Sequence, residues 1–246
     1  MASDSAPRVF RRWFRFSLRT LFVAMLLLGI GFGVLGWMAN EASRQRKVVS
    51  ELEHIGAEVV FANEQPTMPE LLDVGYRRRV REVNLLEAKI NDLAPLREFD
   101  GLVELNLSGT PVTDISVLAE LKNLERLYLY DTEVSDISAL SELTNLQELG
   151  LGNTQVRDIS ALSDLGNLRL LSLDWTAVSA ISALAEMRHL KILLLDGTFV
   201  TDGTVLSELP SLRYLSLAHS DISNLEILVR LQENPNVLII GNNMQR

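Results

Sequence analysis

The chain has 246 residues, of which 47% are hydrophobic and 22% are charged, and its formal net charge at pH 7 is −9. It contains no cysteine, which excludes structural disulfides and thiolate metal sites. Residues 1–40 hold five Arg and one Asp, which leaves 18 basic and 31 acidic side chains, a net charge of −13, for the rest of the chain. This acidic remainder argues against nucleic acid or anionic lipid as its ligand.

A basic tail and an uncharged apolar run begin the chain. Residues 1–20 contain all five of the N-terminal Arg, and residues 21–39 carry no charge. As a helix, the run of residues 21–39 is roughly 28 Å long, enough to cross the hydrocarbon core of a bilayer. Because basic residues gather on the cytoplasmic side, we expect one signal-anchor transmembrane helix in the cytoplasmic membrane, with its N-terminus in the cytoplasm and the repeats outside.

Two alternatives accompany this anchor. The apolar run would also suit a cleaved signal peptide, although it is longer than a usual signal core and lacks a well-spaced cleavage site of small residues. Gly29 and Gly33 form a G-x-x-x-G pair, which would let two copies of the helix form a weak homodimer. Since Gly31 and Gly36 lie nearby, the pair also fits a span that is simply rich in glycine.

The segment between the apolar run and the repeats is predicted to hold a short helix and a cap. Apolar residues recur at helical spacing within residues 40–56, which predicts a juxtamembrane helix or linker that stops at Gly56. Residues 57–61 resemble a strand. A solenoid needs its first coil covered, so we interpret residues 57–79 as the N-terminal cap.

A period of 22 residues dominates residues 80–246. Leucines at this spacing open successive units: Leu102, Leu124, Leu146, Leu168, Leu190 and Leu212. Each unit follows L-x-x-L-x-L-x-x-T-x-V-x-D-I-S-x-L-x-x-L-x-N with small departures. A fixed period of this length predicts a solenoid of parallel strands, in which each unit buries its leucines against its neighbours. Val237 to Ile240 is expected to form the last strand, within a C-terminal cap coil.

Three polar columns recur with the same period. Asp114, Asp136 and Asp158 each precede I-S-x-L and are expected to accept backbone N–H bonds and to start a short helical turn. The Asn that closes a unit is interpreted as a turn residue whose side chain bonds the local backbone. The Thr column is expected to bond the adjacent coil or to be a satisfied internal turn, with an exposed ice-binding ladder as the alternative.

The repeats resemble the leucine-rich-repeat family, in particular the 22-residue bacterial type found in internalins. The segments LERLYLYDTEVSDISALSELTN and LQELGLGNTQVRDISALSDLGN carry the resemblance. It implies an α/β leucine-rich-repeat solenoid with a parallel sheet on the concave face and short helical turns on the convex face, here preceded by one transmembrane helix. The resemblance implies no particular partner.

Candidate partner-binding residues are the aromatic and apolar side chains that alternate with the inward leucines. Exposed side chains of these types are enriched at the centres of protein interfaces. Most of them belong to the C-terminal half of the repeats, and two to an earlier coil: Leu170, Trp175, Ile192, Leu194, Tyr214 and His219, with Tyr128 and Tyr130. An alternative is that these side chains only shield the sheet.

Catalytic and cofactor motifs are missing from the sequence. None of the three His falls in a metal-ligand motif, and no nucleophile elbow or phosphate loop occurs. Asp174 and Asp196 are neighbours in one column, so a hard cation there is an alternative to plain solvation. We therefore expect no cofactor, no resident metal and a membrane-anchored, non-catalytic protein-binding module. The alternatives are a structural envelope protein without a specific ligand, or an enzyme or metal protein.

Overall fold

The computed structural model describes residues 18–61, 80–220, 222, 229 and 234–241, without the side chains of residues 18–32, 35 and 38. The chain divides into two compact units. One comprises residues 1–43 and 66–77, and the other, which contains the repeats, comprises residues 44–65 and 78–246.

Helix α1 extends from Leu18 to His54 and is the first described element. Among the described residues, no helix combines the length and the apolar character needed to span a bilayer. The predicted tail at 1–20 lies almost wholly outside the described residues, as do most side chains of the predicted span at 21–39, including the Gly29 position. The anchor and its dimer face therefore stay predictions.

The last turns of α1 cover the first coil of the repeat unit. Val49 and Leu52 are buried in the same apolar core as the repeats, and Gln45 Nε2 donates a 2.9 Å hydrogen bond to the Glu98 carbonyl. The helix ends just before Gly56, whose φ of +93° suits a glycine helix stop, as predicted. The cap thus includes residues that the sequence placed in the 40–56 segment, while residues 62–79 lie outside the described part.

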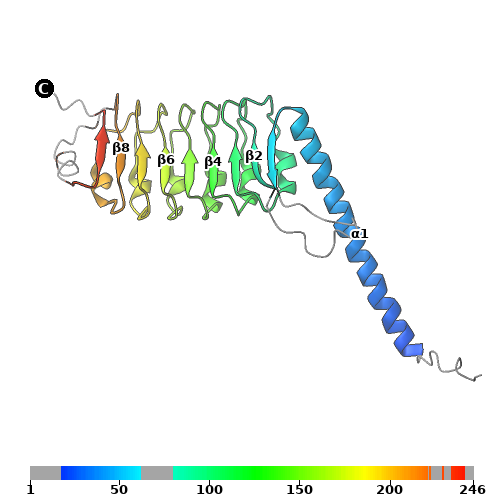
Figure 1. The fold of residues 1–246 in the computed structure, drawn as a ribbon. Coiled ribbons are helices and arrows are strands. Elements are labelled where there is room, and N and C mark those ends of the chain that lie inside the picture. Colours follow the sequence, from blue (N-terminus) through cyan, green and yellow to red (C-terminus); the bar gives the residue numbers. More distant parts are fainter. Residues whose placement is uncertain (1–17, 62–79, 221, 223–228, 230–233, 242–246) are drawn as a thin grey trace, which may run out of the picture. The chain divides into compact units, whose positions relative to one another are not determined.

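The described residues form a nine-stranded sheet whose strands follow chain order (Figure 1). Strand β1 (Glu58–Phe61) pairs antiparallel with β2 (Val80–Asn84), and every later pair is parallel. The remaining strands have three residues each: β3 (Glu104–Asn106), β4 (Arg126–Tyr128), β5 (Glu148–Gly150), β6 (Leu170–Ser172), β7 (Ile192–Leu194), β8 (Tyr214–Ser216) and β9 (Leu238–Ile240).

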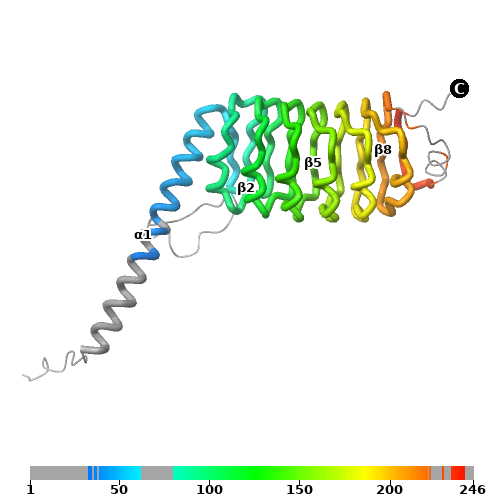
Figure 2. The backbone as a smooth tube through the Cα atoms, turned by 180° about the vertical axis from the view of Figure 1, so that it is seen from behind, coloured from blue at the N-terminus to red at the C-terminus, as the bar shows by residue number. Residues whose placement is uncertain are grey.

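Short 3-10 helices lie across each coil from its strand (Figure 2). They are η2 (Ala94–Glu98), η3 (Ser116–Glu120), η4 (Ser138–Glu142), η5 (Ser160–Leu162), η6 (Ser182–Leu184) and η7 (Thr204–Glu208). Before five of these six helices, an Asp accepts a hydrogen bond from the backbone N–H two residues on, as from Ser116 to Asp114 at 2.8 Å, whereas Ala180 takes this place before η6. The predicted helical turns are therefore confirmed, and an Asp starts most of them.

The inward leucines stack in register through the coils. Leu105, Leu127 and Leu149 are directly paired across β3, β4 and β5, and none has exposed area. The same column continues through Leu171, Leu193 and Leu215 to Ile239 in β9. The predicted ladders and the predicted final strand are both confirmed, because the period of 22 returns the same side chain to the same place in each coil.

The Thr column forms the predicted internal turn, whereas the Asn column acts differently from the prediction. Each buried Thr hydroxyl donates to the carbonyl three residues earlier in its own coil, as Thr110 Oγ1 does to Leu107 O at 2.6 Å. The Asn side chains instead reach the preceding coil, as Asn123 Nδ2 does to Asp100 O at 2.7 Å. The inter-coil bonds thus come from Asn and the local bonds from Thr. Because the Thr column is buried, it forms no exposed ice-binding ladder.

Candidate functional site

The outward side chains of β3 to β8 divide into a charged half and an apolar half. Strand register aligns one column: Glu104, Arg126, Glu148, Leu170, Ile192 and Tyr214. In the charged half, Arg126 Nε lies 2.6 Å from Glu104 Oε2, and this hydrogen bond raises the pKa of the Arg126 guanidinium. Ionic groups of the charged half therefore pair with each other, as Arg126 does with Glu104.

The two tyrosines from β4 and the turn after it form a stacked pair. The ring centroids of Tyr128 and Tyr130 are 6.3 Å apart, and the ring planes differ by 14°. Tyr128 Oη donates a 2.7 Å hydrogen bond to Glu148 Oε2. Burial, followed by this contact with Glu148, raises the pKa of Tyr128. The hydroxyl of Tyr128 is thus engaged within the charged half.

Tyr130 lies across β5, where glycine leaves room for its ring. A Cβ on Gly150 would lie 2.3 Å from Tyr130 Cε2, and one on Gly152 would lie 3.0 Å from Tyr130 Cδ1. The Tyr130 side chain also hydrogen-bonds Ser172 of β6, which is fully buried. The outward positions of Gly150 and Ser172 are therefore covered, and the tyrosine pair is packed into the face rather than projecting from it.

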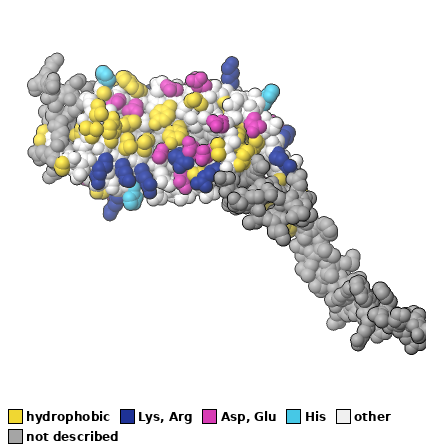
Figure 3. All heavy atoms as spheres, in the orientation of Figure 1, with side chains coloured by type: hydrophobic (Ala, Val, Ile, Leu, Met, Phe, Trp, Pro, Cys, Tyr) yellow, Lys and Arg dark blue, Asp and Glu magenta, His cyan; other side chains and the backbone are white. Residues whose placement is uncertain are grey.

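The C-terminal half of the face carries four neighbouring apolar side chains. Register pairs Leu170 with Ile192, and Ile192 with Tyr214, while Leu194 lies in the next column between two serines. All four are half-buried. Figure 3 shows hydrophobic side chains gathered over β6 to β8. We call these four residues the apolar patch; their predicted adjacency is confirmed.

Trp175 and His219 meet at the edge of the face where the strands end. Their ring centroids are 5.7 Å apart, although the residues are two coils apart. Gly197 occupies the coil between them, and a Cβ there would lie 2.4 Å from Trp175 Cε3. The missing side chain at Gly197 thus lets the indole lie over its backbone and reach the imidazole. Trp175 is 58% exposed, and Phe199, which the sequence prediction omitted, is 65% exposed.

Asp174 and Asp196 are committed to internal hydrogen bonds. Asp174 accepts from Ser172 Oγ at 2.8 Å and from the Asp196 N–H at 3.1 Å. Asp196 Oδ1 accepts from Ser216 Oγ at 2.6 Å and from the Ala218 N–H at 2.7 Å. Burial raises the pKa of Asp174. Within the described ranges, no group of three or more His, Asp or Glu is placed to hold a metal, so the cation alternative has no ligand cluster there.

Three basic side chains were missed by the sequence prediction. Arg169, Lys191 and Arg213 directly precede the strands β6, β7 and β8, and all three are exposed. Figure 3 shows Lys and Arg side chains in a row along one side of the hydrophobic area. We call these three residues the basic row. These residues are also spaced by 22, so comparing the residue before each predicted strand across the repeats would have found them in the sequence.

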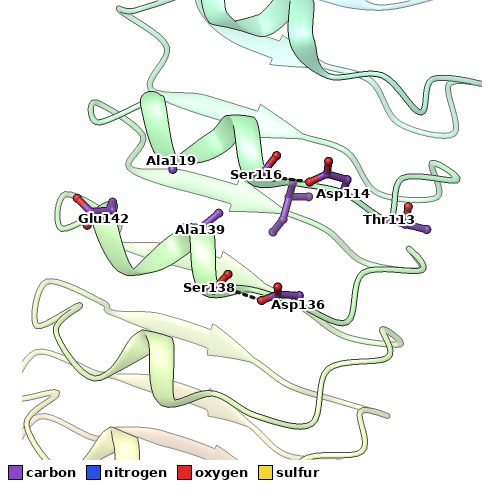
Figure 4. Close-up of a pocket in the computed structure, with 9 residues that line it drawn as sticks. Thr113, Asp114, Ser116, Ala119, Asp136, Ser138, Ala139 and Glu142 are labelled. Carbon is purple, nitrogen blue, oxygen red and sulfur yellow. Dashed lines mark hydrogen bonds between the residues drawn. The ribbon is translucent and has the colours of Figure 1, made fainter.

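A hollow lies between η3 and η4, away from the sheet (Figure 4). Its volume is about 370 Å³, and carboxylates, hydroxyls and methyl groups line it. Asp114 and Asp136 each accept a 2.8 Å hydrogen bond from the backbone N–H of Ser116 or Ser138, which lowers the pKa of both carboxyls. Since this contact recurs in several coils, it serves the fold and marks no separate chemistry.

Comparisons with known proteins agree with this architecture. Residues 100–142 and 122–167 match the family of leucine-rich repeats (two copies). No curated protein sequence matches the chain. An internalin C2 of Listeria monocytogenes is 27% identical, with a TM-score of 0.62 over 65% of this chain and 70% of that one.

Two further solved structures are similar over part of their length. The internalin InlF of Listeria monocytogenes is 28% identical, with a TM-score of 0.56 over 76% of this chain and 52% of that one. A leucine-rich-repeat protein of Leptospira interrogans is 25% identical, with a TM-score of 0.59 over 65% of this chain and 42% of that one. The chain thus spans about half of each of these two relatives. Together with the strand register, the comparisons show that residues 100–167 are similar to leucine-rich repeats and that the solenoid has a fold similar to that of the internalins.

Proposed function

We propose that this protein is a membrane-anchored, non-catalytic module that binds another protein through the outer face of its sheet. The apolar patch carries the proposal. Leu170, Ile192, Leu194 and Tyr214 lie side by side on three strands and keep part of their surface open to solvent. Neighbouring aromatic and aliphatic side chains of this kind form the centres of protein interfaces.

The backbone at Trp175 adds support from an independent direction. Trp175 has a φ of +57°, in the left-handed region that recurs at this position in every coil, where the equivalent residues are Glu87, Gly109, Asp131, Asn153, Gly197 and His219. Asn, Asp and Gly tolerate this conformation, whereas a bulky side chain is disfavoured by roughly 1–2 kcal/mol. Strained residues of this type concentrate at functional sites. A large exposed indole at this position thus favours a role in binding over a role in folding.

The anchor in this proposal rests on the sequence alone. Residues 21–39 are uncharged and long enough for one span, and five Arg precede them. By the positive-inside rule, the N-terminus is cytoplasmic and the solenoid extracytoplasmic. An anchored solenoid would present its sheet face to proteins of the surrounding compartment.

Site-specific crosslinking tests the binding surface. A photo-crosslinking amino acid at position 192, in the apolar patch, is expected to trap a defined protein in intact cells, because a partner covers this position. A matched probe at Ser163, which is exposed just after η5 on the helical side, is expected to trap none.

The captured species then permits a loss-of-function test. Ile192→Asp and Tyr214→Ala are expected to reduce its capture by at least tenfold, as truncation of an interface anchor costs on the order of 2 kcal/mol. Glu142→Ala, in η4 on the helical side, is the control and should retain capture. If the Ser163 probe traps the same protein as efficiently, or if both patch variants bind normally, the sheet face is not the binding surface.

Protease accessibility tests the anchor and its orientation. Protease added to intact spheroplasts of a bacterial host should remove the solenoid and leave a small N-terminal membrane fragment. A cytoplasmic protein marks spheroplast integrity. Full protection of the solenoid would contradict the orientation, and its release without protease would favour a cleaved signal peptide.

A further inference from the structure

We infer that the partner engages this surface with an acidic protein segment, whose carboxylates contact the basic row while its apolar side chains cover the apolar patch. The inference rests on the proposed function and specifies the chemistry of the partner. It starts from Arg169, Lys191 and Arg213, the residues directly before Leu170, Ile192 and Tyr214. Each strand of the patch therefore offers one cation and one apolar side chain in sequence.

The three cations are held close together by the sheet. Parallel neighbours in a sheet are about 4.8 Å apart, so the side chains of the basic row leave the backbone at about that spacing. Like charges at directly neighbouring positions disfavour each other. The row is also unusual in its surroundings, because the chain as a whole has a formal net charge of −9. A ligand with carboxylates would relieve the repulsion within the row.

The basic row lacks the ion pairs that other cations of the solenoid possess. Among the described residues, neither Arg169 nor Lys191 has an acidic side chain within 4.0 Å, and Arg213 Nη1 donates to the Leu212 carbonyl at 2.8 Å. By contrast, Arg97 lies 2.9 Å from Glu120, and Lys122 lies 2.8 Å from Glu142. Several cations of the solenoid are thus paired, whereas the three cations of this row, which lie in successive coils, have no carboxylate partner among the described residues and are open to a ligand.

A polar hollow adjoins one end of the row. It has a volume of about 250 Å³ and is lined by Glu125, Asn145, Gln147, Asn167, Arg169 and His189. The Asn145 and Asn167 amides donate to carbonyls of the preceding coil at 2.8 Å, so they are used by the fold. The Glu125 carboxylate accepts a 3.1 Å hydrogen bond from the Gln147 amide and lies 4.0 Å from Arg126 Nη1, so it is also engaged. Arg169 and His189 are the basic groups that remain, and a carboxylate side chain from a partner fits this chemistry.

The opposite edge of the patch narrows the choice of ligand. Asp174 and Asp196 lie beyond the strand ends there, so an extended polyanion such as nucleic acid would meet acidic groups as well as basic ones. The aliphatic side chains between the two edges also carry no hydrogen-bond donor or positive charge that could bind a phosphate. A protein segment with apolar residues and carboxylates on one side matches both features.

The net negative charge of the solenoid does not prevent this recognition. At physiological ionic strength, exposed charges more than about 8 Å apart are largely screened. The basic row directly precedes Leu170, Ile192 and Tyr214, so it places positive charge beside a ligand seated over these residues, while the neighbouring Glu148 carboxylate accepts a hydrogen bond from Tyr128. The carboxylates of the ligand would lie on the side where the strands begin.

A random peptide display library panned on the full chain in detergent micelles tests the inference. Peptides that combine Asp or Glu with aromatic or aliphatic residues are expected to be enriched. Their affinity should fall by at least about tenfold for R169E/K191E/R213E. It should also weaken with added salt. The matched control, Arg97→Glu/Lys122→Glu/Arg188→Glu, reverses three cations outside the basic row and should retain the affinity. Empty micelles correct for binding to detergent.

The outcomes separate this inference from the proposed function. Enrichment of neutral or basic apolar peptides that need Ile192 but tolerate R169E/K191E/R213E would overturn the acidic chemistry and leave the binding face in place. Enrichment of no peptide, or of peptides that bind equally well after Ile192→Asp and after R169E/K191E/R213E, would overturn both. A circular dichroism spectrum matching that of the original chain is required of every variant.

Discussion

Replacement of Gly150 by Ala probes how the aromatic side chains are seated on the sheet. A Cβ at position 150 would lie 2.3 Å from Tyr130 Cε2, well inside van der Waals contact, so the ring must move. Overfilling a packed site costs typically about 1–3 kcal/mol. We expect Gly150→Ala to lower the free energy of unfolding by that amount, although Ala normally suits a strand better than Gly.

A double-mutant cycle in urea isolates the cause. In a Tyr130→Ala background the added methyl group has room, and Gly150→Ala should then raise stability by roughly 0.5–1 kcal/mol. Gly166→Ala is the control, since no atom lies within 4 Å of a Cβ built there, and it should change stability by less than about 0.5 kcal/mol. An equal cost of Gly150→Ala in both backgrounds would refute the seating of Tyr130 over β5.

Three further predictions concern the solenoid. Leu149→Ala should lower the free energy of unfolding in urea by about 2–5 kcal/mol, because the Leu149 side chain has no exposed area. Glu148→Ala loses one hydrogen bond and should lower it by about 1 kcal/mol. Equal losses for the two variants would contradict the strand register. Asn145→Ala should cost about 1 kcal/mol through its lost inter-coil bond, and an unchanged midpoint would argue against that bond. The hydrogen bond from the backbone N–H of Ser138 lowers the pKa of the Asp136 carboxyl. The ionised carboxylate therefore stabilises the fold fully above the ordinary pKa of 3.8, and this stabilisation is lost as the pH falls through the lowered pKa. The melting temperature of Asp136→Ala should therefore be lower than that of the original chain at pH 7, with the difference shrinking as the pH falls below 3.8.

Part of the proposed binding surface could be predicted from the repeat. Leu170, Ile192 and Tyr214 are spaced by 22 residues, and alternation along a strand places them opposite the buried leucines, so their adjacency follows from the period. The basic row follows the same rule, but it lies one position before each strand, outside the columns that alternation marks. Its significance depends on the structure, in which the side chains of Arg169 and Lys191 have no ion-pair partner among the described residues.

The remaining features of the site depend on neighbours that the sequence pattern does not name. Trp175 reaches His219 because Gly197 removes a side chain from the coil between them. Tyr130 is half-buried because Gly150 and Gly152 let it lie flat across β5. A glycine within a repeat is compatible with many arrangements, and only the adjacent coil decides which ring fills the space.

The amino-acid sequence alone was enough to predict the solenoid, its inward ladders, the order of its strands and the Asp contacts before most of the 3-10 helices, because each of these is local or repeats with a period of 22. It is also the sole basis for the proposed membrane anchor. The tertiary structure decided which polar groups join neighbouring coils: Thr bonds its own coil and Asn reaches the preceding one. It also decided that the end of α1 covers the first coil and which outward side chains stay open. Apart from the Thr bonds, these outcomes depend on distances between residues about 22 positions or more apart, and a side chain such as Asn123 finds its partner by geometry that its own repeat does not contain.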